Sequence, residues 1–250
     1  VGSSFAKSFA LGLDIPLIAV NHMKGHIMAH FIKNKVEENK QPNFPFLCLT
    51  VSGGHTQIVL VKSVTEMIII GETLDDAAGE AFDKSAKILG LSYPGGPLID
   101  KYAKKGDKYK FTFGRHKVGK YDFSYSGIKT SILRVIEKEV EKNPNFIKEN
   151  LEDLCASIQH TIIEILIKKI TKASSELGIN EIAIAGGVSA NSYLRTRLIE
   201  LQEIQKKNVF IPKFEYCTDN AAMIAITGYY QFLEKDFSDQ SVTPTSRLKL

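Results

Sequence analysis

The sequence predicts an α/β protein of two lobes with a cleft between them. Apolar segments of strand length alternate with amphipathic segments of helix length in both halves of the chain. Three of the strands, around residues 46–51, 57–61 and 67–70, follow one another directly and indicate a meander in the first half. A two-lobed α/β architecture commonly binds its ligands in the cleft between the lobes.

A basic window marks the boundary that we predict between the lobes. Residues 101–120 hold eight Lys or Arg and a single acid, Asp107, with aromatic residues between them. We expect this window to be either a solvated connection or a surface that contacts an RNA backbone. The predicted division is a first lobe over 1–120, a second lobe over 121–235 and a tail over 236–250.

The remaining elements follow from residue spacing and from Gly or Pro at their ends. Apolar residues at helical spacing predict helices over 4–13, 22–35, 75–89, 126–142, 149–177, 191–201 and 219–233. Short apolar runs predict further strands over 16–20, 181–185 and 209–211.

Composition describes an ordinary globular chain. Of the 250 residues, 44% are hydrophobic and 24% are charged, and the formal charge of +4 is too small to indicate nucleic-acid binding by itself. No apolar run has the length of a membrane span, and no basic leader precedes an apolar core, so we expect a cytoplasmic protein. Residue 1 is Val and already reads as helix entry, so we expect the chain to begin within a domain.

The three cysteines are odd in number and far apart in the sequence. Cys48 and Cys155 lie in apolar segments, which favours buried free thiols. Cys217 lies two residues before Asp219, so a contact with a metal is an alternative to packing there.

Two histidines four residues apart are the first candidates for chemistry. His22 and His26 fall on one face of the predicted helix, and a distant carboxylate, Asp219, would complete a set of two nitrogens and one oxygen. This set suits iron(II), with zinc or manganese as alternatives, and leaves coordination positions open. The competing interpretations are packed or exposed histidines and an N-cap role for Asp219. His30 shares the face but lies in apolar sequence, which favours a core position.

Glycine-rich turns are the second group of candidates. Ser52-Gly53-Gly54-His55-Thr56 joins two strands and offers backbone amides and hydroxyls to a phosphate, and Gly186-Gly187 repeats this arrangement before Asn191. Asp83 and Asp100 are candidates to bind ribose hydroxyls, or are surface carboxylates. Ser126 either caps a helix or contacts substrate or RNA. A Ser/His/Asp triad, a Walker loop and a dinucleotide fingerprint are all absent from the sequence.

Seven motifs in fixed order carry a resemblance to a known family. The chain resembles the tRNA N6-adenosine threonylcarbamoyltransferases (TsaD-type, formerly described as O-sialoglycoprotein endopeptidases or glycoproteases) to about residue 233. The motifs are His22-Met-Lys-Gly-His26, Ser52-Gly-Gly-His-Thr56, Asp75-Asp-Ala-Ala-Gly-Glu-Ala-Phe-Asp83-Lys, Tyr93-Pro-Gly-Gly-Pro97, Phe123-Ser-Tyr-Ser-Gly-Ile-Lys129, Gly186-Gly-Val-Ser-Ala-Asn191 and Thr218-Asp-Asn-Ala-Ala222.

The resemblance implies a fold and a reaction. The fold is the actin-like ATPase (ASKHA) fold of two ribonuclease-H-like lobes. The reaction transfers the threonylcarbamoyl group from threonylcarbamoyl-AMP to N6 of the adenosine 3′ of the anticodon, in tRNAs that read ANN codons. Members of the family carry further residues, including a hairpin with Glu-Thr-Ser, before the position of Val1. We therefore expect an N-terminally truncated chain whose first lobe is incomplete, and the activity of this polypeptide stays open.

The resemblance also assigns residues and partners. It implies one Fe²⁺ per subunit, with zinc possible, held by His22, His26 and Asp219. It implies contacts with the adenylate or its threonylcarbamoyl group from Ser52, Gly53, Gly54, His55, Thr56, Asp83, Gly96, Asp100 and Asn191. His55 is the candidate general base. The implied partners are tRNA, a scaffold paralogue and a small P-loop ATPase of the bacterial complex, with no membrane.

Three other functions remain as alternatives. An actin-like-fold phosphotransferase or ATPase would also use glycine-rich turns, but such enzymes bind magnesium through carboxylates rather than through histidines. A metallopeptidase of the HExxH type needs a glutamate beside the first histidine, and Met23 stands there. A non-catalytic scaffold paralogue lacks the metal histidines that this chain contains.

Overall fold

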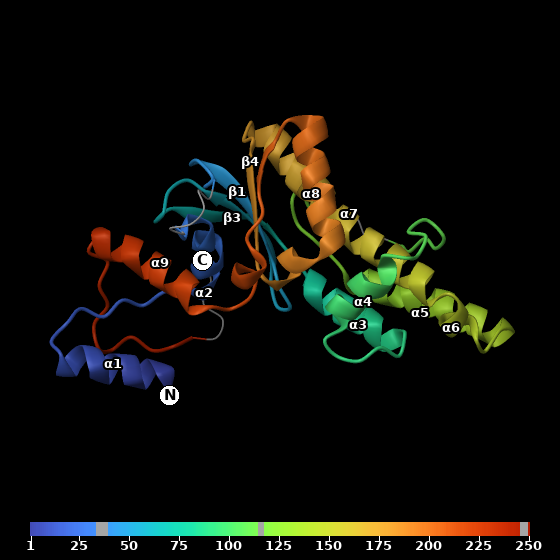
Figure 1. Cartoon of the computed structure of the whole chain (residues 1–250), viewed down its shortest axis with the longest axis horizontal. Coiled ribbons are helices and arrows are strands. Elements are labelled where there is room, and N and C mark those ends of the chain that lie inside the picture. The colour runs from blue at the N-terminus through green and yellow to red at the C-terminus, as the bar shows by residue number, and fades with distance from the viewer. Residues whose placement is uncertain (34–39, 115–117, 246–249) are drawn as a thin grey trace.

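The structure, a computed structural model, describes residues 1–33, 40–114, 118–245 and 250. Its centre is one five-stranded mixed sheet of order β3-β2-β1-β4-β5 (Figure 1). β1 pairs with β2, and β2 with β3, in antiparallel fashion, whereas β1–β4 and β4–β5 are parallel. The strands are β1 (Phe46–Val51), β2 (Thr56–Val61), β3 (Met67–Glu72), β4 (Glu181–Ala185) and β5 (Asn208–Phe210). The predicted meander and α/β class are confirmed.

The sheet crosses the boundary that we predicted at residue 120. β1 lies before this position and β4 after it, yet Leu47 pairs with Ile182 and Thr50 with Ala185. One sheet therefore draws its strands from both predicted segments, and residue 120 does not separate two sheets. The described part of the basic window begins within α4 and ends before α5, and both helices pack in the larger core.

The central strand β1 is buried on both faces because helices cover the sheet on both sides. Leu47, Leu49 and Val51 point into the larger core, and Phe46 and Cys48 point into the smaller core on the opposite face. Alternation of side chains along a strand produces this division. The larger core packs against α3 (Ala78–Ile88), α4 (Gly95–Ala103), α5 (Ser126–Lys142), α6 (Phe146–Glu149), α7 (Leu151–Leu177) and α8 (Ser192–Gln205).

The smaller core packs against two short helices that hold the candidate metal ligands. These helices are α2 (His22–Met28) and α9 (Ala221–Leu233), and they lie side by side on the other face of the sheet (Figure 1). Gly25 faces α9, where a Cβ atom would lie 3.3 Å from Cδ1 of Ile224. The predicted helix 22–35 ends at Met28, continues as a 3-10 turn to Phe31, and partly lies outside the described residues.

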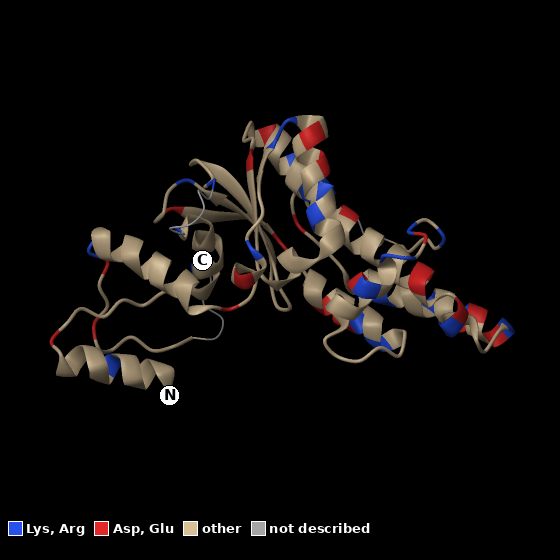
Figure 2. Cartoon of the chain, in the orientation of Figure 1, with Lys and Arg blue, Asp and Glu red and all other residues tan. Residues whose placement is uncertain are grey.

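The N-terminal segment lies beside part of the C-terminal tail, whereas Leu250 itself packs against the smaller core (Figure 1). α1 (Gly2–Gly12) precedes a segment in which only Leu17 pairs in β fashion, with Ser238, so the predicted strand 16–20 is reduced to a single β-bridge. Lys7 Nζ donates a hydrogen bond to the Val242 carbonyl at 2.9 Å, which holds part of the predicted tail against α1. Charged residues are sparse on α1 and α9 and intermix in both signs over α4, α5 and α7 (Figure 2). Among the described helices, none has both the length and the apolar character needed to cross a bilayer.

Candidate active site

Helix α2 begins with a side-chain cap that fixes the positions of both histidines. Asn21 Oδ1 accepts hydrogen bonds from the amides of Met23 at 2.9 Å and Lys24 at 3.2 Å, so the helix starts at His22. His26 follows one turn later on the same face, and the two ring centroids lie 4.8 Å apart.

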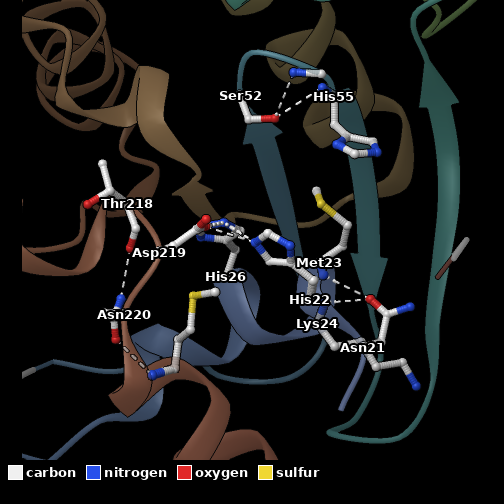
Figure 3. Close-up of polar contacts among 12 residues, drawn as sticks. Asn21, His22, Met23, Lys24, His26, Ser52, His55, Thr218, Asp219 and Asn220 are labelled. Atoms are coloured by element: carbon white, nitrogen blue, oxygen red, sulfur yellow. Dashed lines mark hydrogen bonds and ion pairs between the residues drawn. The ribbon is translucent and has the colours of Figure 1, made fainter. Parts of the chain in front are cut away.

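Asp219 reaches the histidines because its neighbour caps α9. Asn220 Oδ1 accepts a hydrogen bond from the Met223 amide at 2.8 Å and is the N-cap of the helix. The N-cap role that we considered for Asp219 therefore belongs to Asn220. The Asp219 carboxylate is left to point at α2 (Figure 3).

Three ligand atoms converge from α2 and the start of α9. Asp219 Oδ1 lies 2.9 Å from His22 Nε2 and 3.1 Å from His26 Nε2, and the two Nε2 atoms lie 3.1 Å apart. The rings and the carboxylate point toward one another (Figure 3). His26 is buried, whereas His22 and Asp219 are exposed. The group has the donor atoms and the spacing to hold one divalent cation, with open positions on its exposed side.

The environment favours the neutral form of the buried ligand. Burial and the neighbouring His22 lower the pKa of His26, and Asp219 acts in the opposite direction without reversing the shift. A neutral imidazole is the form that coordinates a metal.

The turn between β1 and β2 lies next to this group. Ser52 Oγ accepts hydrogen bonds from the amides of Gly54 at 3.4 Å and His55 at 3.0 Å, and the Ser52 amide donates to the His55 carbonyl at 2.8 Å. The turn is thus closed by its own serine, and Gly53, Gly54 and His55 remain exposed. His55 lines a cavity of about 390 Å³ together with His22 and Met23.

Thr56 has a different position from the other residues of this motif. Its side chain is buried, and its hydroxyl accepts a hydrogen bond from the Ala78 amide at 2.8 Å at the first residue of α3. Thr56 therefore supports the helix start, as a cap from a neighbouring strand, and does not face a cavity.

A second cavity brings together five of the predicted substrate-binding residues. Its volume is about 470 Å³, and Thr218, the neighbour of Asp219, lines one side of it. The N-terminal ends of α3, α4 and α8 contribute to the wall through Gly79, Gly96 and Asn191. The predicted residues in this cleft are Gly53, Asp83, Gly96, Asp100 and Asn191.

The polar groups of the cleft are held by short hydrogen bonds. Asp83 Oδ1 accepts from the Gly95 amide at 2.8 Å, at the start of α4. Asp100 accepts from the Ser192 hydroxyl at 2.7 Å and from its amide at 3.2 Å, at the start of α8. Asn191 caps α8, because its Oδ1 accepts from the Leu194 amide at 2.9 Å. These contacts join α3 to the start of α4, and α4 to the start of α8.

Comparison with known proteins identifies the family. A family profile described as tRNA N6-adenosine threonylcarbamoyltransferase (TsaD) matches residues 1–226. The chain belongs to this family. Curated proteins of this name from Christiangramia forsetii and Riemerella anatipestifer are 58% and 57% identical, over 249 and 250 residues. Each alignment covers 100% of this chain and 73% of the relative. The predicted family and its transferase class are confirmed.

Solved structures show the fold. A crystal structure of full-length HypF in the phosphate- and nucleotide-bound form superposes with a TM-score of 0.64 at 15% identity, covering 89% of this chain and 37% of HypF. HypF of T.kodakarensis gives a TM-score of 0.60 at 14% identity, covering 93% of this chain and 39% of that one. The predicted α/β actin-like fold is confirmed by these neighbours together with the family match.

One family motif has a structural role that sequence reasoning left open. The Asp75 carboxylate accepts hydrogen bonds from the hydroxyls of Ser124 at 2.5 Å and Ser126 at 2.8 Å and from the Tyr125 amide at 2.7 Å. Burial alone would raise the pKa of Asp75, but these hydrogen bonds lower it. Asp75 thus caps α5 from a distant loop, and the helix predicted from residue 75 begins at Ala78.

Cysteine takes no part in the site. Cys217 is buried, with its Sγ 3.2 Å from Nη2 of Arg195 and its thiol donating to the Lys213 carbonyl. Cys48 and Cys155 are buried free thiols, as predicted, and burial raises the pKa of Cys155 to about 12. Residues of the cleft wall that we had not assigned include Phe82, Tyr93 and Thr218. All three residues lie within the motifs that carry the family resemblance, and those motifs could have identified them.

Proposed function

We propose that this chain transfers a threonylcarbamoyl group from threonylcarbamoyl-AMP to N6 of the adenosine 3′ of the anticodon in tRNAs reading ANN codons. The names of the relatives specify a tRNA adenosine and its N6 atom as the acceptor, and the family match extends this acceptor to the present chain. The observation that carries the proposal is the junction at Thr218 and Asp219. Thr218 lines the cleft, and the next residue completes the candidate metal group.

The three ligand atoms support a site for one divalent metal such as iron(II). Asp219 Oδ1 and the two Nε2 atoms are separated by 2.9, 3.1 and 3.1 Å, so all three could bind the same ion. Two imidazoles and one carboxylate are a donor set typical of iron(II) sites, and zinc remains the alternative metal.

The cleft has the features of a site for the adenylate. The starts of α3, α4 and α8 direct backbone amides and the positive ends of helix dipoles toward the space beside Gly53 and Gly96, where a phosphate would be stabilised. Asp83 uses one carboxylate oxygen for the Gly95 amide, and both oxygens of Asp100 accept from Ser192. These fixed carboxylates are the proposed acceptors of hydrogen bonds from ribose hydroxyls. Tyr93, which is 85% exposed at the cleft, offers a ring to the adenine.

The chemistry needs orientation more than it needs a nucleophilic side chain. The donor is a mixed anhydride, so attack by the adenosine N6 forms the new bond to the carbamoyl carbon as the bond to the AMP phosphate breaks. A bound metal would act as a Lewis acid on oxygen atoms of the donor. His55, on the exposed turn beside His22, is the proposed acceptor of the proton that N6 loses. The Gly53 amide is the proposed donor to developing charge on oxygen.

The remaining expectations about the cellular setting belong to this proposal. They are a cytoplasmic location, a scaffold paralogue and a small P-loop ATPase as partners, and one metal ion per subunit. A phosphotransferase or ATPase remains the alternative enzyme, and it would release phosphate from ATP in the absence of tRNA.

The test is tRNA modification by variants of the exposed ligands. His22→Ala and Asp219→Ala should lose bound metal and should reduce the modified nucleoside, measured in tRNA digests, by at least 10²-fold, the scale on which removing a metal ligand acts. Glu215→Ala removes a carboxylate four residues before Asp219 that no ligand atom contacts, and it is the matched control. Full modification by both ligand variants would refute the metal-assisted mechanism.

A further inference from the structure

A cluster of rings surrounds one lysine, Lys108, behind the wall of the cleft formed by Asp100 and Asn191. Lys108 Nζ is 5.2 Å from the ring centroid of Tyr109 and 5.1 Å from that of Tyr193. The His160 ring lies 5.2 Å from that of Tyr109, edge to face, and His160 Nδ1 lies 2.9 Å from the Tyr193 hydroxyl. We call these four residues the Lys108 cluster. They come from the loop after α4, from α7 and from α8.

The cluster is joined directly to the wall of the cleft. Tyr193 follows Ser192, whose amide and hydroxyl bind Asp100. His160 follows Gln159, whose Oε1 accepts a hydrogen bond from the Asn191 side chain at 2.8 Å. Both Asp100 and Asn191 line the cleft. The Lys108 cluster is therefore attached, through Ser192 and Gln159, to the wall formed by Asp100 and Asn191.

The charge of the cluster is not neutralised by the acids around it. Lys105 and Lys110 of the same loop face Glu152 at 3.8 Å and Asp153 at 2.7 Å on α7. Glu164, an acid that acts on Tyr193 electrostatically, is paired with Arg197 at 2.6 Å. In the part of the chain that the structure describes, Lys108 has no carboxylate within ion-pair distance, and its polar neighbours are Tyr193, whose hydroxyl lies at 3.4 Å, and Tyr109.

A second lysine–tyrosine pair in the chain shows the contrast. Lys120 Nζ lies 5.1 Å from the Tyr121 ring, almost the same distance as in the Lys108 cluster. This pair is closed by Glu176, which binds Lys120 at 3.0 Å and the Tyr121 hydroxyl at 2.6 Å. Tyr109, in contrast, exposes 69% of its surface beside an uncompensated ammonium group. An exposed ring next to a free cation is the combination that binds an unpaired nucleotide, since the base stacks on the ring and the phosphate meets the cation.

We propose that the Lys108 cluster is the docking surface for an unpaired nucleotide of the RNA substrate that lies next to the acceptor adenosine. The base stacks on the exposed face of Tyr109, and Lys108 contacts the adjacent phosphate. His160 and Tyr193 hold the two residues in place. This surface rests on the proposed function, because it assumes that the acceptor adenosine enters the cleft. The lysines of the basic window then have different roles. Lys105 and Lys110 pair with acids of the protein, whereas Lys108 contacts the RNA.

The test is binding of two RNA hairpins to the full chain, measured by fluorescence anisotropy over a range of salt concentrations. One hairpin carries an unpaired seven-nucleotide loop (about the size of an anticodon loop), and the other carries a minimal loop with the same number of phosphates. We expect Tyr109→Ala to weaken binding of the looped hairpin on the order of ten-fold, and Tyr109→Phe to retain it. We expect Lys108→Ala to reduce the slope of log K against log salt by about 0.7, the contribution of one phosphate contact on a single strand.

The controls separate this surface from the proposed function. Tyr121→Ala and Lys120→Ala should bind both hairpins as the wild-type protein does. Binding of metal and of an adenylate analogue needs no RNA, so all variants should retain both, which also shows that they are folded. Wild-type affinity of Tyr109→Ala and Lys108→Ala for the looped hairpin would overturn the proposal, as would equal losses in the Lys120 and Tyr121 variants. If the wild-type protein binds neither the metal nor the adenylate analogue, the proposed function is refuted instead.

Discussion

Asp219 Oδ1 lies 2.9 Å from His22 Nε2, although the two residues are 197 positions apart in the sequence. The contact exists because Asn220, one residue later, caps α9 and leaves the Asp219 carboxylate to point at α2. A helix start on one side of the site and a second helix start on the other thus set the geometry of the candidate metal group.

The first prediction concerns the cap that positions Asp219. Asn220→Ala removes the acceptor of the Met223 amide and should lower the free energy of unfolding by about 1 kcal/mol. Because Asp219 is then less well placed, affinity for iron(II) should fall, whereas Asn220→Ser retains the cap and should retain affinity. Denaturant unfolding and anaerobic metal titration measure the two effects. Unchanged metal affinity in Asn220→Ala would show that the cap does not position the ligand.

The second prediction compares two glycines at the cleft. A Cβ atom on Gly79 would lie 2.6 Å from the Ser52 carbonyl oxygen and 2.8 Å from Cα of Gly53, so backbone must move. A Cβ atom on Gly96 would meet only the Phe82 side chain, at 3.8 Å.

Gly79→Ala should therefore destabilise the fold by about 1–3 kcal/mol and displace the turn that carries His55, as overpacking does elsewhere. Gly96→Ala should have the same urea midpoint of unfolding as the wild-type protein. The comparison uses urea unfolding of both variants, and equal stability of the two would contradict the close approach of α3 to the turn.

The third prediction is a dependence of stability on pH through His30. This histidine is buried in the 3-10 turn that follows α2, and its Nε2 donates to the Ile184 carbonyl at 2.9 Å. Burial lowers its pKa to about 4, and the hydrogen bond to Ile184 offsets part of that shift. Its unfolded pKa is about 6.5. Between these values the unfolded chain binds more protons, so stability falls as pH drops from 6.5 toward 4 and is fully present above 6.5.

Protonation of His30 should lower the free energy of unfolding on the order of 3 kcal/mol across this pH window. His30→Gln keeps a donor and removes the titration, so the variant should show a smaller decrease in unfolding free energy between pH 7 and pH 4.5. Parallel pH profiles of the variant and the wild-type protein would contradict a neutral buried His30.

The fourth prediction concerns the link between the loop before α3 and the start of α5. Asp75→Ala removes the acceptor of two serine hydroxyls and one amide, and we expect a loss of about 1–2 kcal/mol at this partly exposed position. Ser124→Ala in the Asp75→Ala background should cost less than in the wild-type protein. A double-mutant cycle measures this coupling, and additive effects would show that the two residues act independently.

The sequence predicted local features of the site better than it predicted their context. His22 and His26 follow from the helical repeat, and the glycine turns follow from residue type, since both depend on a few adjacent residues. Seven motifs in order then identified the family and, through it, Asp219 as the third ligand. Capping by Asn220 rather than Asp219 could not be decided, because both residues are good caps and one position separates them.

The errors come from contacts between distant segments. The pairing of β1 with β4 joins segments more than a hundred residues apart, and no local pattern in the sequence reports it. The helix start at Ala78 and the burial of Thr56 have the same origin. Asp75 is drawn to Ser124 and Ser126 on α5, and the Thr56 hydroxyl is used by the Ala78 amide.

The central claim is that two imidazoles and one carboxylate anchor a metal at the edge of the cleft. Anaerobic titration of the purified chain with iron(II), followed by X-ray absorption at the iron edge, tests it most directly. The account predicts one ion per chain in a six-coordinate shell with two imidazoles and no sulfur, and loss of this ion in Asp219→Ala but not in Glu215→Ala. A shell that contains sulfur, or iron that remains bound in Asp219→Ala with the wild-type spectrum, would contradict it.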